Sequence, residues 1–360
     1  MKNKNLLSII LSTLVIVAMA FVVSCEGPEG PMGATGENGT NGVDGLNGID
    51  GVDGLDGGTS CAECHDLSTD LYAKIQQYNV STHAVGGNFE RNGGSCAICH
   101  THEGFLDNLI TGAGSSDAAA VNPTRVNCRT CHKIHETYDV SDYDLRVVGP
   151  VTLMNNGMQV VDLGAANMCA SCHQSRSISP VPVPGGADVE VTSIRYGPHH
   201  GPQSNMLMGY DMVEIPGSES YPTSNPHTNV EGACIGCHMS DPYGIQAGGH
   251  TWNMTYEYHG AAAIWDAGCV GCHTSPDFHD DLEAFEDEIN VMLEDIRILL
   301  EAQGVLDADG YAVPGIMAAD LAGSLLNYRY VALEDRSVGI HNPFYVKALL
   351  TNTLEYLQTL

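Results

Sequence analysis

The sequence predicts a mainly α-helical protein with extensive irregular loops, a helical C-terminal part and a glycine-repeat spacer near the N-terminus. The 360 residues include 41 glycines and 16 prolines, which interrupt helices and strands often. Hydrophobic residues make up 43% of the chain, but only 6 phenylalanines and 2 tryptophans are available to fill a core. We therefore expect something other than large side chains to fill part of the interior.

The charge of the chain is strongly negative. Asp and Glu number 44 against 14 Lys and Arg, so the formal net charge is -30 at pH 7. Such a field repels phosphate backbones instead of releasing counterions from them. The sequence therefore excludes a nucleic-acid partner and favours basic protein partners.

Three C-terminal segments carry apolar residues at helical spacing. The first covers residues 281–303, with Leu282, Ile289 and Ile296 on one side, and Gly304 ends it. Further helices are expected over residues 316–328 and 343–360. Such stripes are typical of core packing, so residues 281–360 are expected to complete the preceding domain.

Twelve of the 13 cysteines form six copies of the motif Cys-x-x-Cys-His. Two thiols three residues apart lie on one side of a short helical turn, where they can add to the two vinyl groups of a haem. The histidine that follows is then carried beneath the iron. Zinc also binds paired cysteines, but it has no need of a histidine after every pair. The motifs therefore predict six covalently bound haems c.

The predicted haem-attachment cysteines are Cys61, Cys64, Cys96, Cys99, Cys128, Cys131, Cys169, Cys172, Cys234, Cys237, Cys269 and Cys272. The predicted proximal iron ligands are His65, His100, His132, His173, His238 and His273. The chain between the first and last motif is too short to enclose six porphyrins separately. We therefore expect a hexahaem domain over residues 59–280 in which neighbouring haems form much of the core.

Ten histidines lie outside the motifs, and six of them would give every iron a second axial ligand. The candidates lie just before or after a motif, in a Gly/Pro loop, or at the start of the last helix. They are His83, His135, His199, His200, His227, His250, His259 and His341. The alternative for each is an ordinary surface or hydrogen-bonded histidine, and this alternative is favoured for His102 and His279.

The first 24 residues combine Lys2 and Lys4 with an apolar run over residues 6–23. Small residues then precede Cys25, the one cysteine outside the motifs. This pattern resembles a bacterial lipoprotein signal, which implies cleavage after residue 24 and lipidation of Cys25; the alternative is an uncleaved membrane helix. Glu26 occupies the position where an aspartate would imply retention in the inner membrane. We expect an outer-membrane lipoprotein that faces the periplasm or the cell surface, and the pattern favours the cell surface.

Glycine recurs at every third position from residue 27 to residue 57, which is collagen-like periodicity. The tract has few prolines, and it carries acidic residues without a basic one. Residues 25–58 are therefore expected to form an extended, solvated spacer. Two alternatives are a stalk that forms a homotrimer and a structure that binds calcium through its Asp and Asn side chains.

Beyond the motifs, four short sequence segments resemble segments of a known group of proteins. They are Gly-Pro-His-His-Gly-Pro-Gln (197–203), Cys-Ile-Gly-Cys-His-Met (234–239), Gly-Gly-His-Thr (248–251) and Val-Gly-Ile-His-Asn-Pro (338–343). Over residues 60–360 the chain resembles multihaem c-type cytochromes related to pentahaem nitrite reductases and hydroxylamine oxidoreductases. The resemblance implies that His341 is a distal ligand. The chain lacks the Cys-x-x-Cys-Lys motif that usually holds the catalytic haem of those nitrite reductases.

The sequence therefore predicts electron transfer at the cell envelope, towards an extracellular acceptor or another redox protein. The alternative is a reductase of a small nitrogen or sulfur oxyanion, of the nitrite, hydroxylamine or tetrathionate class. Arg91, Arg195, Tyr196 and His102 are of the right type for such chemistry, but the sequence identifies none as catalytic. A third hypothesis is a surface structural protein that acts through its collagen-like tract.

Overall fold

The computed structural model describes residue 65 and residues 69–86, 88–119 and 121–360. All of these belong to one compact unit. The predicted signal sequence 1–24, the lipidation site Cys25, the spacer 25–58 and the cysteines Cys61 and Cys64 lie outside the described residues. Within the described ranges, no helix is both long enough and apolar enough to cross a membrane.

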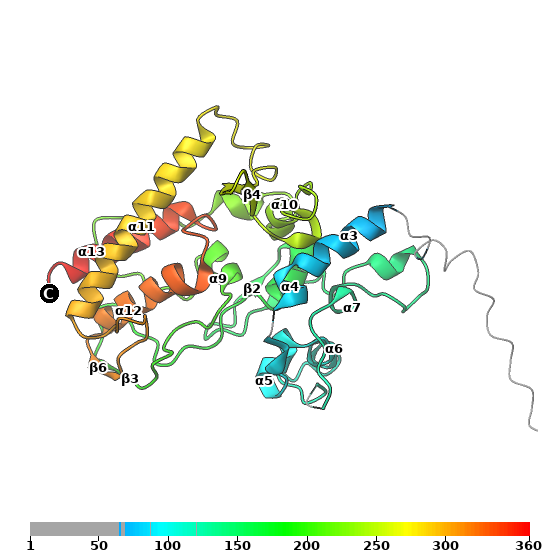
Figure 1. Cartoon of the computed structure of the whole chain (residues 1–360). Helices are drawn as coiled ribbons and strands as arrows, with labels where there is room; N and C mark the ends of the chain where they lie inside the picture. Colours follow the sequence, from blue (N-terminus) through cyan, green and yellow to red (C-terminus); the bar gives the residue numbers. More distant parts are fainter. Residues whose placement is uncertain (1–64, 66–68, 87, 120) are drawn as a thin grey trace, which may run out of the picture. The chain divides into compact units, whose positions relative to one another are not determined.

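Helices are the main regular structure of the described residues and the strands are short, which confirms the mainly α class with irregular loops (Figure 1). The helices are α3 (Thr69–Val80), α4 (Thr82–Val85), α5 (Gly94–His100), α6 (His102–Thr111), α7 (Cys128–Cys131), α8 (Asn167–Ala170), α9 (Gln203–Met208), α10 (Cys234–His238), α11 (Phe278–Ala302), α12 (Ala319–Tyr328) and α13 (Pro343–Leu357). The 3₁₀ turns are Asn88–Glu90, Val140–Tyr143, Gly164–Ala166, Pro226–Asn229 and Gly249–Thr251, and a π-helix covers Arg329–Asp335.

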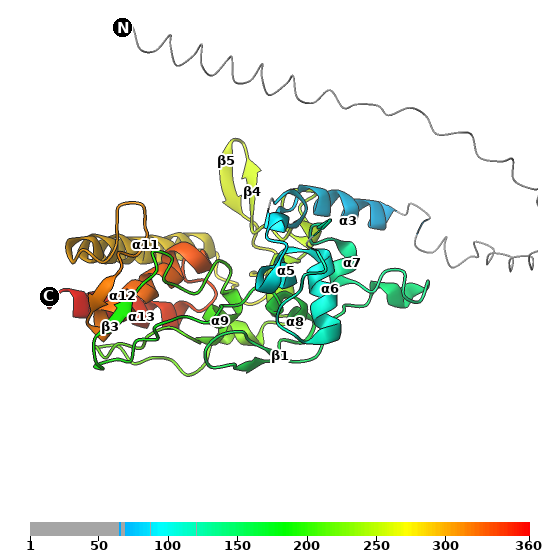
Figure 2. The same ribbon diagram turned by 90° about the horizontal axis from the view of Figure 1, so that it is seen from below.

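The strands form three antiparallel pairs, each of two strands. They are β1 (Val151–Thr152) with β2 (Val160–Val161), β3 (Val189–Val191) with β6 (Gly315–Met317), and β4 (Thr255–Tyr258) with β5 (Ala261–Ile264). The hairpin of β4 and β5 projects from the rest of the fold in Figure 2. Its turn lies at His259 and Gly260, which both have positive φ angles.

The main apolar core lies among the C-terminal helices, which both ribbon views place together. The predicted helices 281–303 and 343–360 are confirmed as α11 and α13. Their apolar stripes pack in the main core together with residues of α12, and the stripe residues Ile289 and Ile296 are fully buried, whereas Leu282 near the start of α11 is half-buried. Fully buried members of this core are Ile289, Ile296, Leu300, Leu325, Leu326, Leu349, Leu350 and Leu357.

The helix predicted over residues 316–328 starts later than expected. Residues 316 and 317 belong to β6, where Met317 is opposite Val189 and Ile316 is opposite Glu190. Pairing with a strand more than 120 residues earlier in the chain determines the extended conformation here, and local helical spacing does not reveal such pairing. The helix α12 therefore begins at Ala319.

The region of the Cys-x-x-Cys-His motifs has little apolar packing of its own. Its one buried hydrophobic cluster among the described residues consists of Leu153, Val161 and Ala170. Four of the motifs begin or lie within short helices, namely α5, α7, α8 and α10. Residues 69–177 and 226–273 thus contribute nothing to the main core, whereas the segment 178–215 does.

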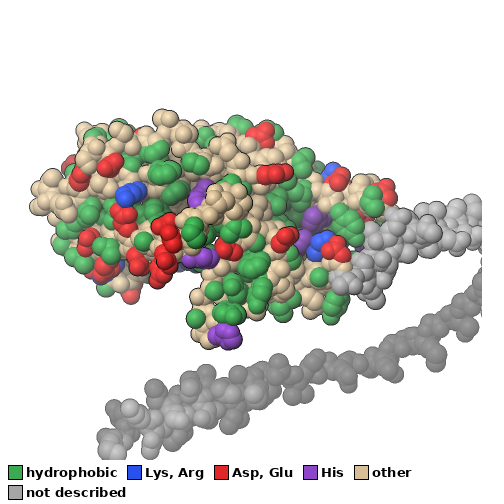
Figure 3. Space-filling model, turned by 90° about the horizontal axis from the view of Figure 1, so that it is seen from above, with side chains coloured by type: hydrophobic (Ala, Val, Ile, Leu, Met, Phe, Trp, Pro, Cys, Tyr) green, Lys and Arg blue, Asp and Glu red, His purple; other side chains and the backbone are tan. Residues whose placement is uncertain are grey.

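Acidic side chains are spread over the surface of the described region. Figure 3 shows one face on which Asp and Glu clearly outnumber Lys and Arg. The helix α11 contributes to this character, since Asp280 and Asp281 occupy its first turn. Negative charges at a helix N-terminus also interact favourably with the helix dipole.

Candidate haem centres

Each of the six motif histidines lies beside one histidine from another part of the chain. We number these pairs as sites 1 to 6, in the order of the motifs. Site 1 is His65 with His135 (ring centroids 6.1 Å apart), site 2 His100 with His199 (6.2 Å), site 3 His132 with His250 (6.3 Å), site 4 His173 with His83 (6.0 Å), site 5 His238 with His341 (6.2 Å) and site 6 His273 with His227 (6.3 Å).

The spacing of these rings matches coordination of one metal ion by two imidazoles. A histidine nitrogen binds a transition metal at about 2 Å and its ring centre lies roughly 1 Å further away, so two axial histidines on one iron have centroids about 6 Å apart. All six pairs fall between 6.0 and 6.3 Å. The donor set therefore fits a haem iron with two axial histidines at every motif.

Hydrogen bonds orient the paired rings so that Nε2 is available for a metal. Each hydrogen bond that a paired ring makes through Nδ1 ends on an oxygen acceptor, so Nδ1 carries the proton and Nε2 has the free lone pair. The Nδ1 partners are Tyr143 O for His132 (2.6 Å), Gln203 Oε1 for His173 (3.1 Å), Ile340 O for His227 (2.7 Å), Trp252 O for His238 (3.0 Å) and Asp335 Oδ1 for His341 (2.7 Å).

The pKa values of most paired histidines also favour the neutral, metal-binding form. Burial lowers the pKa of His83, His199 and His250 to about 4 each, and neighbouring histidines, together with basic side chains at His199 and His250, lower it further. Burial likewise lowers the pKa of His100, His173, His227 and His238. These imidazoles are therefore uncharged at neutral pH, as iron ligation requires.

His341 differs from the other paired histidines in its electrostatic surroundings. Burial lowers its pKa, but the charge of Asp335 and the hydrogen bond to it raise the pKa, and the balance lies above the ordinary value of 6.5. The side chain of Asp335 is fully buried. A carboxylate in this position pulls the Nδ1 proton and makes Nε2 a stronger electron donor.

Trp252 joins three of the sites. Its ring centroid is 4.6 Å from that of His83 in site 4 and 5.6 Å from that of His250 in site 3. Its backbone oxygen accepts the Nδ1 hydrogen bond of His238 in site 5. Trp252 directly follows the 3₁₀ turn Gly249–Thr251 and has a left-handed backbone, with φ of 55°. Sites 3, 4 and 5 therefore converge on one residue.

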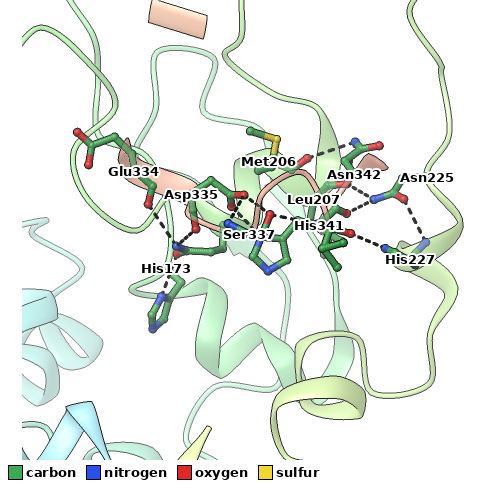
Figure 4. Close-up of polar contacts among 12 residues, drawn as sticks. His173, Met206, Leu207, Asn225, His227, Glu334, Asp335, Ser337, His341 and Asn342 are labelled. Carbon is green, nitrogen blue, oxygen red and sulfur yellow. Dashed lines mark hydrogen bonds and ion pairs between the residues drawn. The ribbon is translucent and has the colours of Figure 1, made fainter. Parts of the chain in front are cut away.

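The π-helix and the segment after it hold ligands of two sites together (Figure 4). Gln203 accepts from His173 of site 4 through Oε1, and its Nε2 donates to the backbone oxygen of Asp335 at 3.1 Å. Asp335 in turn binds His341 of site 5. One side chain therefore links the supports of sites 4 and 5.

The same segment also supports site 6. The backbone oxygen of Ile340 accepts from His227, and the next residue in the chain is the site 5 histidine His341. Asn225 fixes this arrangement, because its side-chain amide donates to the backbone oxygen of His341 at 2.7 Å (Figure 4). Sites 5 and 6 are consequently held by adjacent residues.

At site 1 a buried carboxylate shapes the loop that presents His135. Asp142 accepts from the backbone N–H groups of His135 at 2.7 Å, Glu136 at 3.0 Å and Thr137 at 2.8 Å. Burial raises the pKa of Asp142, but these donors outweigh it and lower the pKa to about 2. They also stabilise a turn in which His135 has a φ of 66°.

Four histidines are not paired with a motif histidine. His200, a candidate from the sequence, forms an ion pair with the buried carboxylate of Glu334. His259, also a candidate, lies in the hairpin turn with its ring 4.1 Å from that of Tyr258. The ring of His102 is hydrogen-bonded to Thr130, and that of His279 to Asp266, both at 3.0 Å. The structure thus brings six of the eight candidates to motif histidines.

The thiols of neighbouring motifs lie close to one another. All ten motif cysteines that the structure describes are free of disulfides. The Cys99 sulfur is 4.0 Å from the backbone oxygen of Ser171, between the two cysteines of the next-but-one motif. The adjacent thiol of Cys172 lowers the pKa of Cys99, and that of Cys169 lowers the pKa of Cys234 to about 7.

Sequence reasoning did not find the residues that support the paired rings. Gln203 is the last residue of the segment 197–203, whose two histidines were candidate ligands, so its position close to a site could have been predicted. Trp252 carries no such sequence signal, because two of its contacts are with His83 and His238 of distant segments. Asp142 carries none either, because it follows His135 by seven residues in an irregular loop. Asp335 precedes His341 by six residues, a spacing that predicts contact in no regular element.

Two comparisons with known proteins give no match: no family model matches the chain, and no solved structure matches it. The chain is similar to two polyhaem cytochromes of Geobacter sulfurreducens. It is 24% identical over 348 residues to the C-type polyheme cytochrome OmcB, which aligns 73% of this chain with 44% of the relative. It is 24% identical over 337 residues to the C-type polyheme cytochrome OmcC, with 73% and 43% aligned.

The chain spans less than half the length of these curated relatives. Their names do not support the narrower resemblance to nitrite reductases and hydroxylamine oxidoreductases. The similarity supports the wider prediction, a multihaem c-type cytochrome.

Proposed function

We propose that the chain binds six haems c, each between two axial histidines, and transfers electrons through them. The observation that carries this proposal is the set of six histidine pairs, each joining one motif histidine to a distant one at 6.0–6.3 Å. The haems supply one-electron exchange between ferric and ferrous iron. The chain attaches them, fixes both axial ligands and sets their surroundings.

Pairing at every motif favours electron transfer over the reductase alternative. A reductase of nitrite, hydroxylamine or tetrathionate needs an iron with an open position and proton donors beside it. Among the residues considered for that role, the Tyr196 hydroxyl donates to Pro180 O at the main core. His102 is hydrogen-bonded to Thr130. The negative charge of the chain also disfavours approach of an anionic substrate.

Contacts between the sites support an order for the haems, which we number as the sites. His132 of site 3 and His135 of site 1 are three residues apart in the chain, which supports proximity of haems 3 and 1. The contacts of Trp252 support proximity of haems 3, 4 and 5. The adjacent residues Ile340 and His341 support a position of haem 6 beside haem 5. The contact of the Cys99 sulfur with the fourth motif supports a position of haem 2 beside haem 4. Electrons thus follow the path 1–3–4–5–6, with haem 2 as a branch at haem 4.

The proposed location is the outer membrane. In this proposal residues 1–24 are a signal peptide, Cys25 carries the lipid, and residues 25–58 space the haem domain from the bilayer. The haem domain (59–280) and its helical part (281–360) then face the cell surface and pass electrons to an extracellular acceptor or to another redox protein. The sequence pattern around Cys25 and the acidic, glycine-periodic tract support this placement.

Mass spectrometry and electron paramagnetic resonance test the proposal. The purified holoprotein should have a mass equal to the chain plus six haems. Its ferric spectrum should contain low-spin haems with two nitrogen ligands. A single high-spin haem that shifts when nitrite or hydroxylamine is added would instead support the reductase. A lower haem count would contradict the six-site assignment.

The substitution Asp142→Ala is expected to remove His135 from haem 1. Three backbone N–H groups lose their shared, negatively charged acceptor, and these hydrogen bonds are what stabilise the conformation of the loop. The left-handed turn at His135 then relaxes. One haem in six should become high-spin in the ferric optical and resonance spectra.

Asp139→Ala is the matched control, because Asp139 caps the Val140–Tyr143 turn of the same loop and has no hydrogen bond to His135. It should keep all haems low-spin. Equal loss of low-spin signal in both variants would mean that the loop as a whole, and not the Asp142 carboxylate, positions the ligand.

A further inference from the structure

The partners of the paired histidines differ in charge at one site. In sites 3, 4 and 6 the Nδ1 acceptors are uncharged: backbone oxygens for His132 and His227, and an amide oxygen for His173. Among the Nδ1 acceptors of the paired histidines in the described part of the chain, Asp335 is the one carboxylate, and it binds the site 5 histidine His341 at 2.7 Å.

The carboxylate of Asp335 is placed so that its charge acts on that ring. Its side chain is fully buried, and low polarity strengthens the interaction of a charge with its hydrogen-bond donor. Its second oxygen accepts from the hydroxyl of Ser337, and also from the Ser337 N–H at 3.3 Å. The donors to Asp335 are therefore one imidazole and one serine, with no cationic side chain.

The preceding residue provides a contrast. Glu334 is also buried, but it pairs with Arg329 at 3.5 Å and with His200. Neither partner belongs to a paired site. A carboxylate on an axial imidazole raises the basicity of the ligand, and a more basic ligand favours ferric over ferrous iron.

We propose that Asp335 makes haem 5 a low-potential step between haems 4 and 6. This inference rests on the proposed function and assigns a regulatory residue within it. One electron leaves the ferrous iron of one haem and reduces the ferric iron of the next, and no bond is made or broken. Because haem 5 lies between haems 4 and 6, Asp335 sets the energy that an electron needs to pass between haem 6 and the other four.

Redox titration of the full-length holoprotein, followed by optical and paramagnetic resonance spectra, tests this role. In the native protein one of the six components should be reduced last. In Asp335→Asn that component should shift to higher potential while the other five stay in place. Glu334→Gln removes the same formal charge one residue earlier and should leave that component unmoved.

A second variant gives a shift of opposite sign. Ser337→Ala removes the hydroxyl that draws charge to the second oxygen of Asp335, so the same component should move to lower potential. If haem 5 of Asp335→Asn loses an axial ligand and becomes high-spin, the shift in Ser337→Ala alone tests whether Asp335 sets the potential of haem 5. No downward shift in Ser337→Ala, or an equal upward shift in Asp335→Asn and Glu334→Gln, would overturn the role of Asp335. Fewer than six haems in the native protein would instead overturn the proposed function.

Discussion

Without covalent haem, residues 69–177 and 226–273 are expected to lose their structure while α11, α12 and α13 keep theirs. These two segments contribute no residue to the main core, and the buried hydrophobic side chains larger than alanine among their described residues are Ile98, Phe105, Leu153, Val161 and Met168. Ordering each residue costs roughly 1–2 kcal/mol, and burial of so few apolar side chains does not offset that cost. Six haems would supply the missing apolar surface.

Hydrogen exchange measured by mass spectrometry checks this expectation segment by segment. The chain is produced in a host that lacks the machinery for attaching haem c and is compared with the holoprotein. Peptides from α3, α5 and α6 should exchange rapidly in the haem-free chain, whereas peptides from α11 and α13 should keep their protection. Protection that persists in α5 and α6 would show that the motif region folds on its own side chains.

The sequence predicts features that depend on neighbouring residues better than features that depend on contacts between distant segments. The Cys-x-x-Cys-His motif depends on neighbouring residues alone, so it is visible in the sequence wherever it occurs. The stripes of α11 and α13 were likewise predicted, since they repeat at 3.6 residues. The start of α12 was not, because pairing of β6 with β3 is a contact between distant segments.

The same distinction explains the second set of histidines. His199 and His200 are adjacent in a loop, and nothing in the sequence separates them. In the structure a φ of 74° at His199 places its ring near His100, while the ring of His200 meets Glu334 from the far end of the chain. The order of the sites, and the contact of Trp252 with sites 3, 4 and 5, depend on the same kind of long-range contact.

The substitution His83→Ala is expected to open the iron of haem 4, the proposed junction of the path. His83 lies on the single helical turn α4, which Ser81 holds by accepting from Ala84 N at 3.3 Å. Its ring centroid is 4.6 Å from that of Trp252, and α4 holds no second histidine that could take its place. One haem in six should become high-spin, and its ferrous form should bind carbon monoxide.

Added imidazole should restore the low-spin spectrum of His83→Ala, because the substitution removes the ligand ring and leaves the turn that carried it. His259→Ala serves as the control: this ring lies in the hairpin turn beside Tyr258 and is paired with no motif histidine. It should leave all haems low-spin. If His259→Ala produced the high-spin haem and His83→Ala did not, the pairing at site 4 would not describe the axial ligands. The position of haem 4 between haems 3 and 5 in the proposed path would then lose its basis, since the contact of site 4 with Trp252 runs through His83.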